Sequence, residues 1–278
     1  MDAFRNRVAV ITGGASGIGA AMARAFAARG AKIVLADIDR QGLSTMEHEL
    51  ASAGAPVLCV PTDVRDRASV HSLAEATWQR FGAAHIVCNN AGIALLGEIA
   101  KAPHEDWEFT MNVDFWGVVH GVEAFVPRLI DQRAGGHVVN TASMAGLVGM
   151  QWLGIYCAAK FAVVGLTEAL HRELKPHSIG ASVLCPMIVE TKIGENSARL
   201  RSGAQGPASG ASAVPAAGVM RGGTVTAESV AAKVVRGIER QDLYILTHPE
   251  QREILRRRAA RIDAVFETFE AEEKERAR

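Results

Sequence analysis

The chain has 278 residues, of which 49% are hydrophobic and 22% are charged, a composition that can bury a large core. Lysine and arginine total 30, as do aspartate and glutamate, so the formal net charge is +0. A nucleic-acid-binding protein usually has a basic excess that neutralises phosphates, so this balance argues against a nucleic-acid partner.

The N-terminus and the cysteines indicate a cytoplasmic location. The first five residues lead straight into a strand-like segment, unlike a signal peptide. The most apolar helical stretches contain charges such as Lys160 and Glu168, so we expect no membrane span. The cysteines form no C-x-x-C pair and no zinc spacing with histidine, so we expect no metal site. Three of them should be buried strand thiols in a reducing compartment: Cys59, Cys88 and Cys185.

Strand-like apolar runs alternate with helical segments along the chain. We expect strands at residues 7–12, 32–36, 56–60, 85–88, 136–141, 180–185 and 243–246. We expect helices at residues 17–29, 40–53, 67–81, 152–175 and 227–240, and a long helix at 105–133 that is broken near Asn112. This alternation predicts one α/β domain over residues 1–278, a doubly wound, seven-stranded parallel sheet of Rossmann-like type with helices on both faces.

Two segments depart from this alternation. Residues 194–223 are rich in glycine, alanine, serine and proline with little periodicity, so we expect a disordered loop or a flexible lid over the substrate. Residues 249–278 are highly charged with sparse apolar positions. That pattern predicts a C-terminal surface helix that docks on the domain or on a partner subunit.

The first expected strand ends in a glycine-rich turn that opens a helix. Residues 12–19 read T-G-G-A-S-G-I-G, a T-G-x-x-x-G-x-G pattern. Glycines permit a tight turn and the close approach of a diphosphate, and the helix N-terminus supplies free N–H groups. A plain glycine-rich turn is the alternative, but the strand–turn–helix context favours dinucleotide binding. The candidate contacts are Gly13, Ser16, Gly17, Ile18 and Gly19.

Asp37 falls at the end of the second expected strand, 18 residues after Gly19. A carboxylate there can accept the ribose hydroxyls of an adenosine and repels a 2′-phosphate, which favours NAD over NADP. Arg40 argues the other way, because it could reach a phosphate. The alternative role of Asp37 is that of an ordinary turn or helix N-terminal acid.

Two further groups follow strands. Asp63 and Val64 come after the third expected strand, where the carboxylate could bond an adenine and the Val64 backbone could flank the ring. Asp63 could equally cap the helix that begins near Arg67. Asn90, in the N-N-A-G run that follows the fourth strand, could line a ribose and also bond the backbone to lock the sheet.

Tyr156 and Lys160 are four residues apart on an expected helix, so their side chains share one face. A nearby ammonium and an oxidised nicotinamide favour the phenolate, so Tyr156 could act as a general acid or base. A partly buried tyrosine beside a lysine that reaches for solvent is the alternative.

Two polar residues could complete this site. Ser143 follows the fifth expected strand, where ligands of open α/β sheets bind, and could orient a carbonyl; it could also be an ordinary loop serine. Asn112 interrupts a helix and could free a carbonyl for a water that leads to Lys160, or could mark a kink without function.

Taken together, these motifs resemble the short-chain dehydrogenase/reductase family, over roughly residues 5 to 246. They are the glycine-rich turn, N-N-A-G at residues 89–92, Asn112, Ser143, and Y-x-x-x-K from Tyr156 to Lys160, in family order and spacing. The resemblance implies a catalytic tetrad, a homotetramer or homodimer, and an interface on the helices around residues 111–133 and 152–175. The implied tetrad is Asn112, Ser143, Tyr156 and Lys160.

The resemblance also implies that residues 186–191 contact the cofactor carboxamide, through the Val189 backbone and the Thr191 hydroxyl. The family usually has glycine after the proline of this run, whereas this chain has Met187. We therefore expect Met187 to shape the pocket in a way that ordinary members do not.

We expect a small-molecule substrate, namely an apolar or aromatic secondary alcohol or ketone, and NAD as the cofactor. The expected pocket residues are Met144, Leu147, Met150, Trp152, Leu153, Met187 and Ile188, each of which could instead be core packing. The alternatives are an epimerase or dehydratase that retains its NAD and a cofactor-binding regulator without catalysis. The region after Ile193 is too small for a sugar-nucleotide domain, and a regulator would usually lack the tyrosine or the lysine.

Overall fold

The structure, a computed structural model, describes residues 3–205 and 222–277. Its seven strands form one all-parallel sheet in the order β3-β2-β1-β4-β5-β6-β7. The strands are β1 (Val8–Thr12), β2 (Lys32–Asp37), β3 (Val57–Pro61), β4 (Ile86–Asn89), β5 (Gly136–Thr141), β6 (Ile179–Cys185) and β7 (Tyr244–Leu246). The chain order reverses between β1 and β4, where the carboxyl ends of the strands open a crevice.

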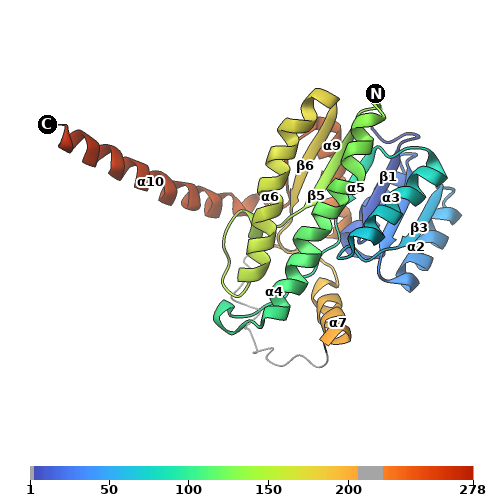
Figure 1. Ribbon diagram of the computed structural model, residues 1–278, viewed down its shortest axis with the longest axis horizontal. Coiled ribbons are helices and arrows are strands. Elements are labelled where there is room, and N and C mark those ends of the chain that lie inside the picture. The colour runs from blue at the N-terminus through green and yellow to red at the C-terminus, as the bar shows by residue number, and fades with distance from the viewer. Residues whose placement is uncertain (1–2, 206–221, 278) are drawn as a thin grey trace.

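Helices cover both faces of the sheet (Figure 1). They are α1 (Gly17–Ala27), α2 (Arg40–Ser52), α3 (Arg67–Phe81), α4 (His104–Met111), α5 (Gly117–Asp131), α6 (Gly154–Leu174), α7 (Ile193–Gln205), α9 (Ala227–Arg240) and α10 (Arg252–Arg276). A π-helical turn, Asn112–Trp116, joins α4 to α5.

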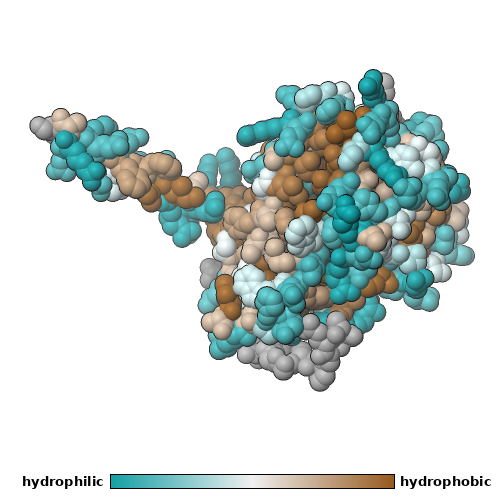
Figure 2. Space-filling model, in the orientation of Figure 1, coloured by the Kyte–Doolittle hydropathy of each residue, from teal (hydrophilic) through white to brown (hydrophobic). Residues whose placement is uncertain are grey.

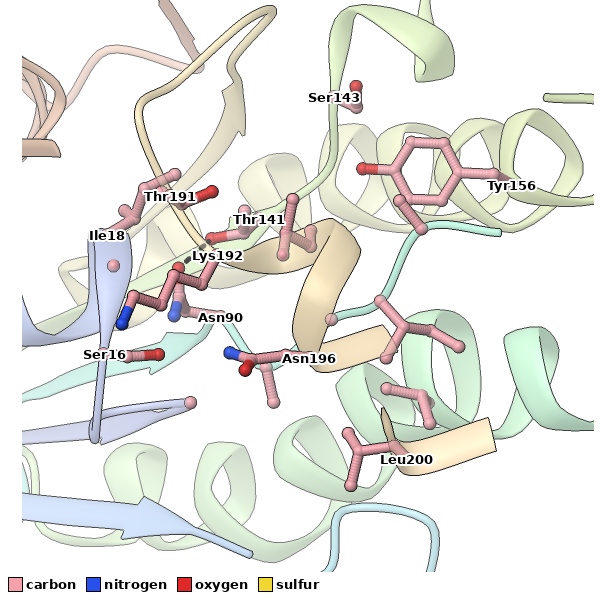
Figure 3. A pocket seen from close by; sticks show the side chains of 18 of the residues that line it. Ser16, Ile18, Asn90, Thr141, Ser143, Tyr156, Thr191, Lys192, Asn196 and Leu200 are labelled. Atoms are coloured by element: carbon pink, nitrogen blue, oxygen red, sulfur yellow. Dashed lines mark hydrogen bonds between the residues drawn. The ribbon is translucent and has the colours of Figure 1, made fainter. Parts of the chain in front are cut away.

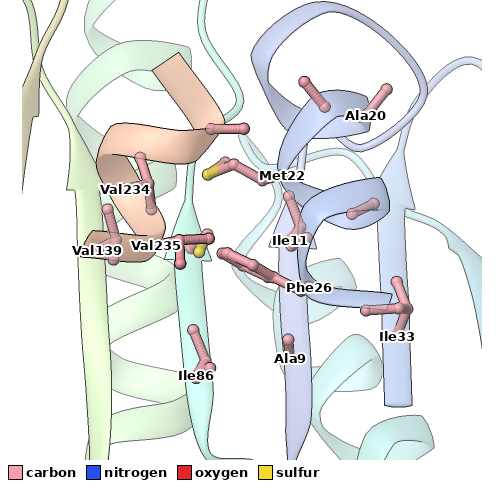
Figure 4. Packing of buried hydrophobic residues seen from close by; sticks show 14 of the residues in the cluster. Ala9, Ile11, Ala20, Met22, Phe26, Ile33, Ile86, Val139, Val234 and Val235 are labelled. Atoms are coloured by element: carbon pink, nitrogen blue, oxygen red, sulfur yellow. The ribbon is translucent and has the colours of Figure 1, made fainter. Parts of the chain in front are cut away.

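Side chains alternate between the two faces of the sheet, as the period of a strand requires. On one face, Ile11 packs with α1, α2 and α9; Figure 4 shows the ring of Phe26 of α1, next to Ile11, pointing toward Val235 of α9. On the other face, Val10 packs with α3, α5 and α6. The five inner strands are therefore buried on both sides and read as nearly continuous apolar runs, whereas the edge strands β3 and β7 are partly exposed.

The structure confirms the predicted fold class, with every strand end within one residue of its expected position. Helix α6 begins at Gly154 rather than residue 152, because Trp152 has a φ of +67° and cannot belong to a right-handed helix. Two thiols expected to be buried, Cys88 and Cys185, are so, while Cys59 is partly exposed.

The two unusual segments differ from expectation. The first part of residues 194–223 is not a disordered loop, because Ile193–Gln205 is the helix α7, while the role of the segment as a flexible lid stays a prediction. Residues 206–221 of that segment lie outside the described residues. The C-terminal segment is helical as predicted, but α10 extends away from the domain instead of docking on it (Figure 1).

Candidate active site

A cavity of about 550 Å³ opens at the carboxyl ends of the strands, where the sheet order reverses. Figure 3 shows Ser16, Ile18 and Thr191 at one end of it and Ser143 and Tyr156 at the other. Eleven of the predicted site residues besides the Tyr156–Lys160 pair line it: Gly13, Ser16, Gly17, Ile18, Asp37, Asp63, Val64, Asn90, Ser143, Val189 and Thr191.

The glycine-rich turn leaves room at the N-terminus of α1. Gly13 and Gly17 have φ values of +66° and +52°, and a Cβ on Gly13 would lie 2.9 Å from the Ala91 Cα. Ser16, which precedes the helix, makes no capping hydrogen bond with its side chain. Gly19 does not line the cavity; it lets α1 pack on the turn, since a Cβ there would lie 2.1 Å from the Gly13 carbonyl oxygen. A dinucleotide diphosphate fits this cradle of backbone N–H groups.

The carboxylate of Asp37 is held by backbone groups before any ligand arrives. It accepts hydrogen bonds from the N–H of Ala15 (3.0 Å) and the N–H of Asp39 (3.0 Å). Burial raises the pKa of Asp37 above its usual range, although these N–H groups oppose the rise. Asp39, not Asp37, caps α2, so the role of Asp37 as a helix cap is excluded.

Asp63 also serves no helix cap, because Asp66 accepts the capping bond of α3. Instead, Asp63 accepts the N–H of Arg65 and forms a bidentate ion pair with its guanidinium, 2.6 Å at the shortest. Burial raises the pKa of Asp63, but the bonds from Arg65 lower it by more, so the carboxylate stays ionised. Arg65 is therefore a cation on the cavity wall that the sequence analysis did not include.

Asn90 joins the ends of three strands. Its amide donates to the Thr12 carbonyl oxygen (3.0 Å), and its side-chain oxygen accepts from the Thr141 hydroxyl (3.2 Å). Its backbone N–H donates to the Thr12 hydroxyl. The expected role of Asn90 in locking the sheet is confirmed, and the residue also lines the cavity, where its contact with a ribose stays a prediction.

Tyr156 and Lys160 lie on the face of α6 that points into the cavity, as their spacing predicts. The Lys160 ammonium is 5.5 Å from the centre of the Tyr156 ring and donates to the Thr141 carbonyl oxygen (3.0 Å). The Ser143 hydroxyl, at the end of β5, is within bonding reach of Tyr156 and donates to the Pro186 carbonyl oxygen (3.3 Å). The alternative of a lysine that reaches for solvent is excluded, because Lys160 is 2% exposed.

The side chain of Asn112 is exposed and does not line the cavity. Its carbonyl accepts the N–H of Gly117 within the π-helical turn, and a carbonyl oxygen has a second lone pair, so its role in holding a water stays a prediction. The π-helical turn places Asp114, rather than Asn112, beside Lys160. The Asp114 carboxylate lies 3.1 Å from the Lys160 ammonium and accepts the Ile93 N–H (3.1 Å).

Asp114 is completely buried and changes the charge of the site. Gly92 leaves room for it, because a Cβ there would lie 2.8 Å from the Asp114 carboxylate. Burial lowers the pKa of Lys160, but the attraction of Asp114 and Tyr156 raises it by more, so the lysine is firmly protonated. The second carboxylate oxygen of Asp114 has no hydrogen-bond partner among the described residues.

The pKa of Tyr156 is raised, not lowered. Burial is the largest cause, and the charge of Asp114 adds to it, while Lys160 and the hydrogen bond of Ser143 act in the opposite direction. Lys160 therefore acts in the expected direction, but burial and Asp114 outweigh it in the protein by itself, and the joint effect of the ammonium and an oxidised nicotinamide stays a prediction. Lys160 is less effective than expected because Asp114 offsets its charge.

The far end of the cavity is apolar. Of the seven expected pocket residues, four line it: Met150, Leu153, Met187 and Ile188. Met144, Leu147 and Trp152 do not. The sequence analysis missed other apolar lining residues because they lie on helices and loops far apart in the chain: Ile93, Phe109, Val113, Ile193 and Leu200.

Helix α7 forms one wall of the cavity and is tied to the body. Arg201 forms a bidentate ion pair with Asp106 of α4 (2.7 and 3.0 Å), and the buried Ser197 hydroxyl accepts the Ala94 N–H (2.9 Å). Lys192, just before α7, also lines the cavity, and in Figure 3 its amine points toward the end of the cavity that Ser16 lines. Composition alone gave no sign of these contacts, since they join distant segments.

The described residues also bear on a metal site and on a membrane span. Among residues 3–205 and 222–277, no group of three or more histidine, cysteine, aspartate or glutamate side chains is placed to hold a metal. Within the same ranges, no helix is both long and apolar enough to cross a membrane.

Comparison with known proteins gives a consistent picture. The family model described as short chain dehydrogenase matches residues 7–201. The CLA biosynthesis dehydrogenase/reductase of Lactiplantibacillus plantarum is 34% identical over 271 residues, covering 94% of this chain and 95% of the relative. The C alpha-dehydrogenase of a Sphingobium species is 34% identical over 270 residues, covering 95% of this chain and 88% of the relative.

A solved structure agrees along almost the whole chain. A short chain dehydrogenase/reductase from Burkholderia phymatum, solved in complex with NAD, superposes with a TM-score of 0.89 at 38% identity. The match covers 95% of this chain and 96% of that one. The chain belongs to the short-chain dehydrogenase/reductase family of oxidoreductases.

Proposed function

We propose that this protein is an NAD-dependent dehydrogenase/reductase that interconverts apolar or aromatic secondary alcohols and the corresponding ketones. The observation that carries the proposal is the position of Tyr156. Its hydroxyl is within hydrogen-bonding reach of Ser143, and its ring centre lies 5.5 Å from the buried ammonium of Lys160. Both side chains line a cavity with an apolar far end. This arrangement can hold a substrate oxygen and exchange one proton with it.

The residues present fit a dinucleotide. The backbone N–H groups at the start of α1, with Ser16 and the amine of Lys192, would hold the diphosphate. Asp37 would accept the adenosine ribose hydroxyls, and Val189 and Thr191 would lie against the carboxamide. When bound, the nicotinamide supplies or accepts the hydride, and in its oxidised form it adds a positive charge near Tyr156.

The protein's own groups handle the proton. In alcohol oxidation, the Ser143 hydroxyl would orient the substrate oxygen while the Tyr156 oxygen accepts the proton of the alcohol. In ketone reduction, the Tyr156 hydroxyl would donate that proton to the substrate oxygen. Lys160 stabilises the phenolate form of Tyr156. Asp114 acts as a positioning residue, because it holds the Lys160 ammonium in place and sets how much of that charge reaches Tyr156.

The substrate preference follows from the walls. Met187 and Ile188 lie on the loop after β6, and Leu153 and Met150 lie before α6, so the substrate's carbon skeleton would contact mainly apolar atoms. Arg65 is bound to Asp63. Lys160 is paired with Asp114, and Arg199 lies 4.0 Å from Asp39. Since we assign Lys192 to the diphosphate, no cation among the described lining residues is left for a substrate carboxylate, and a neutral substrate is favoured.

We further propose a homo-oligomer, a tetramer or dimer, in a cytoplasmic setting. In Figure 2, hydrophobic residues gather over the region of α5 and α6, which supports an interface there. Exposed apolar surface of this kind often marks a contact between subunits.

The test is a comparison of NADH and NADPH by fluorescence titration of the purified protein, followed by turnover with apolar secondary alcohols. We expect NADH to bind at least about tenfold more tightly, and cofactor to be reduced in a one-to-one ratio with alcohol oxidised. Preference for NADPH would overturn the role of Asp37. Turnover without net cofactor reduction would indicate an epimerase, and the absence of any binding would overturn the proposal.

A further inference from the structure

The helix α10 leaves the body of the molecule and extends away from it (Figure 1). Its base is anchored, because the buried His248 side chain bonds the Gly223 carbonyl oxygen (2.9 Å) and the Arg258 guanidinium lies 5.4 Å from the centre of the Phe161 ring. Every residue from Ala259 to Ala277 is exposed. At 1.5 Å per residue, this free part of the helix is about 27 Å long.

One side of α10 is apolar. At 100° per residue, its large hydrophobic side chains fall within an arc of about 120°. They are Ile254, Leu255, Ile262, Val265, Phe266 and Phe269. Figure 2 shows this stripe in brown along the middle of the helix. Val265, Phe266 and Phe269 are 54%, 61% and 60% exposed, so the stripe has no cover within the described chain.

The two halves of α10 carry opposite charges. Residues 252–261 contain five arginines and one glutamate, which gives four net positive charges. Residues 262–276 contain six acidic and two basic residues, which gives four net negative charges. A helix divided in this way is complementary to itself when a second copy runs in the opposite direction, whereas a parallel pair would place like charges together.

We propose that α10 is a dimerisation arm that pairs in antiparallel fashion with α10 of a second copy of this chain, around a two-fold axis near Ile262. In this arrangement position 255 of one copy lies against position 269 of the other, and the stripe is buried along its whole length. The basic half of each arm lies beside the acidic half of the other. One segment then supplies both sides of the interface, as a two-fold contact requires.

The pairing also accounts for the helix itself. A helix without tertiary packing is only marginally stable in water, even with favourable side-chain pairs. The arm has such pairs within itself, between Glu253 and Arg257 (3.0 Å) and between Glu270 and Lys274 (4.0 Å). Pairs of this kind add only a few tenths of a kcal/mol each, so burial of the stripe is the larger source of stability.

The first experiment places a cysteine at the proposed axis in the full-length protein. Ile262→Cys should give a disulfide-linked dimer under mild oxidation, because the two positions 262 face each other. The matched control, Ala264→Cys, lies about 200° around the helix from position 262 and should stay monomeric on a non-reducing gel. It also reports any background from the native thiols. No link at 262, or equal links at 262 and 264, would overturn the proposal; the former is the result expected if the arm packs on the body of another subunit.

The second experiment tests the charge pattern in the Ile262→Cys background. One variant makes the arm acidic throughout: Arg256→Glu, Arg257→Glu and Arg261→Glu. The other makes it basic throughout: Glu267→Lys, Glu270→Lys and Glu272→Lys. Each variant alone should form the link about tenfold more slowly, because like charges now face each other. An equimolar mixture of the two should restore the original rate. Unchanged linking by either variant alone, or no recovery on mixing, would overturn the antiparallel arrangement.

Discussion

The ammonium of Lys160 lies 3.1 Å from the carboxylate of Asp114, and neither side chain is more than 2% exposed. Burial raises the pKa of Asp114, while the charge and hydrogen bond of Lys160 lower it. Tyr156 therefore faces a lysine paired with a carboxylate rather than an isolated cation. The charge of Asp114 contributes to the raised pKa of Tyr156. In the proposed reaction, the pH dependence of alcohol oxidation therefore depends on a residue that does not line the cavity.

Asp114→Asn should move the pH profile of alcohol oxidation to lower pH. Oxidation requires the Tyr156 phenolate, so kcat/KM rises with pH through the pKa of Tyr156. Removing the negative charge lowers that pKa, so the rising limb of the profile shifts to lower pH. The measurement is kcat/KM against pH for both proteins. Asp131→Asn, the same change at the far end of α5, should leave the limb in place, and an unmoved limb in Asp114→Asn would contradict this role.

Tyr156→Phe should reduce kcat by about 10²- to 10⁴-fold or more while NADH still binds, because only the proton donor and acceptor is removed. The chain contains two tyrosines, which provides a matched control. Tyr244 is exposed and bonds Glu168 outside the cavity, so Tyr244→Phe should turn over normally. Near-normal turnover by Tyr156→Phe would refute the assignment.

Arg201→Met should loosen α7, since it removes the ion pair with Asp106 and keeps a side chain of similar length. A partly buried pair of this kind is worth about 1–2 kcal/mol, so we expect KM for the alcohol to rise about five- to thirty-fold. Cleavage within residues 193–205 by a protease should also become faster. Arg67→Met, which removes a surface pair with Glu123, is the control and should change neither. If KM and cleavage match the unmodified protein, α7 is held by other contacts.

Acid should destabilise the fold partly through His137. Burial is the main cause that lowers its pKa to about 4, and its ring bonds the Ser182 hydroxyl (2.7 Å). Between pH 6.5 and about 4, the unfolded chain binds a proton at this residue that the folded chain excludes, so stability falls as pH falls. The contribution between pH 7 and pH 5 is about 2 kcal/mol. Denaturant melts of the protein and of His137→Gln at both pH values should show a smaller loss in the variant; equal losses would argue against it.

The sequence predicted the sheet well because a strand buried on both faces has a pattern that local composition reveals. The segment Arg7–Thr12 reads as one apolar run, and its side chains do pack on both faces. The start of α6 was predicted less accurately, because the residue type of Trp152 does not reveal its left-handed backbone.

The site was predicted where residue type and position coincide. Asp37 and Tyr156 each follow from chemistry that few residues supply at those places. Asp114 was missed because the π-helical turn changes which side chains face α6, so spacing counted on a regular helix is misleading. A signal was present, since an acid between Val113 and Phe115 in an apolar helical stretch needs a buried cation, and Lys160 was already identified as one.

The bonds from Ala15 and Asp39 to the Asp37 carboxylate have a consequence for how cofactor choice arises. The carboxylate is aimed by the backbone of two separate turns, one after β1 and one after β2. Its direction is therefore decided when the chain folds, and no side-chain rotation remains for the ligand to select. On the proposed role of Asp37, a change of loop length after this residue would alter cofactor choice even though no side chain that touches the ligand had changed.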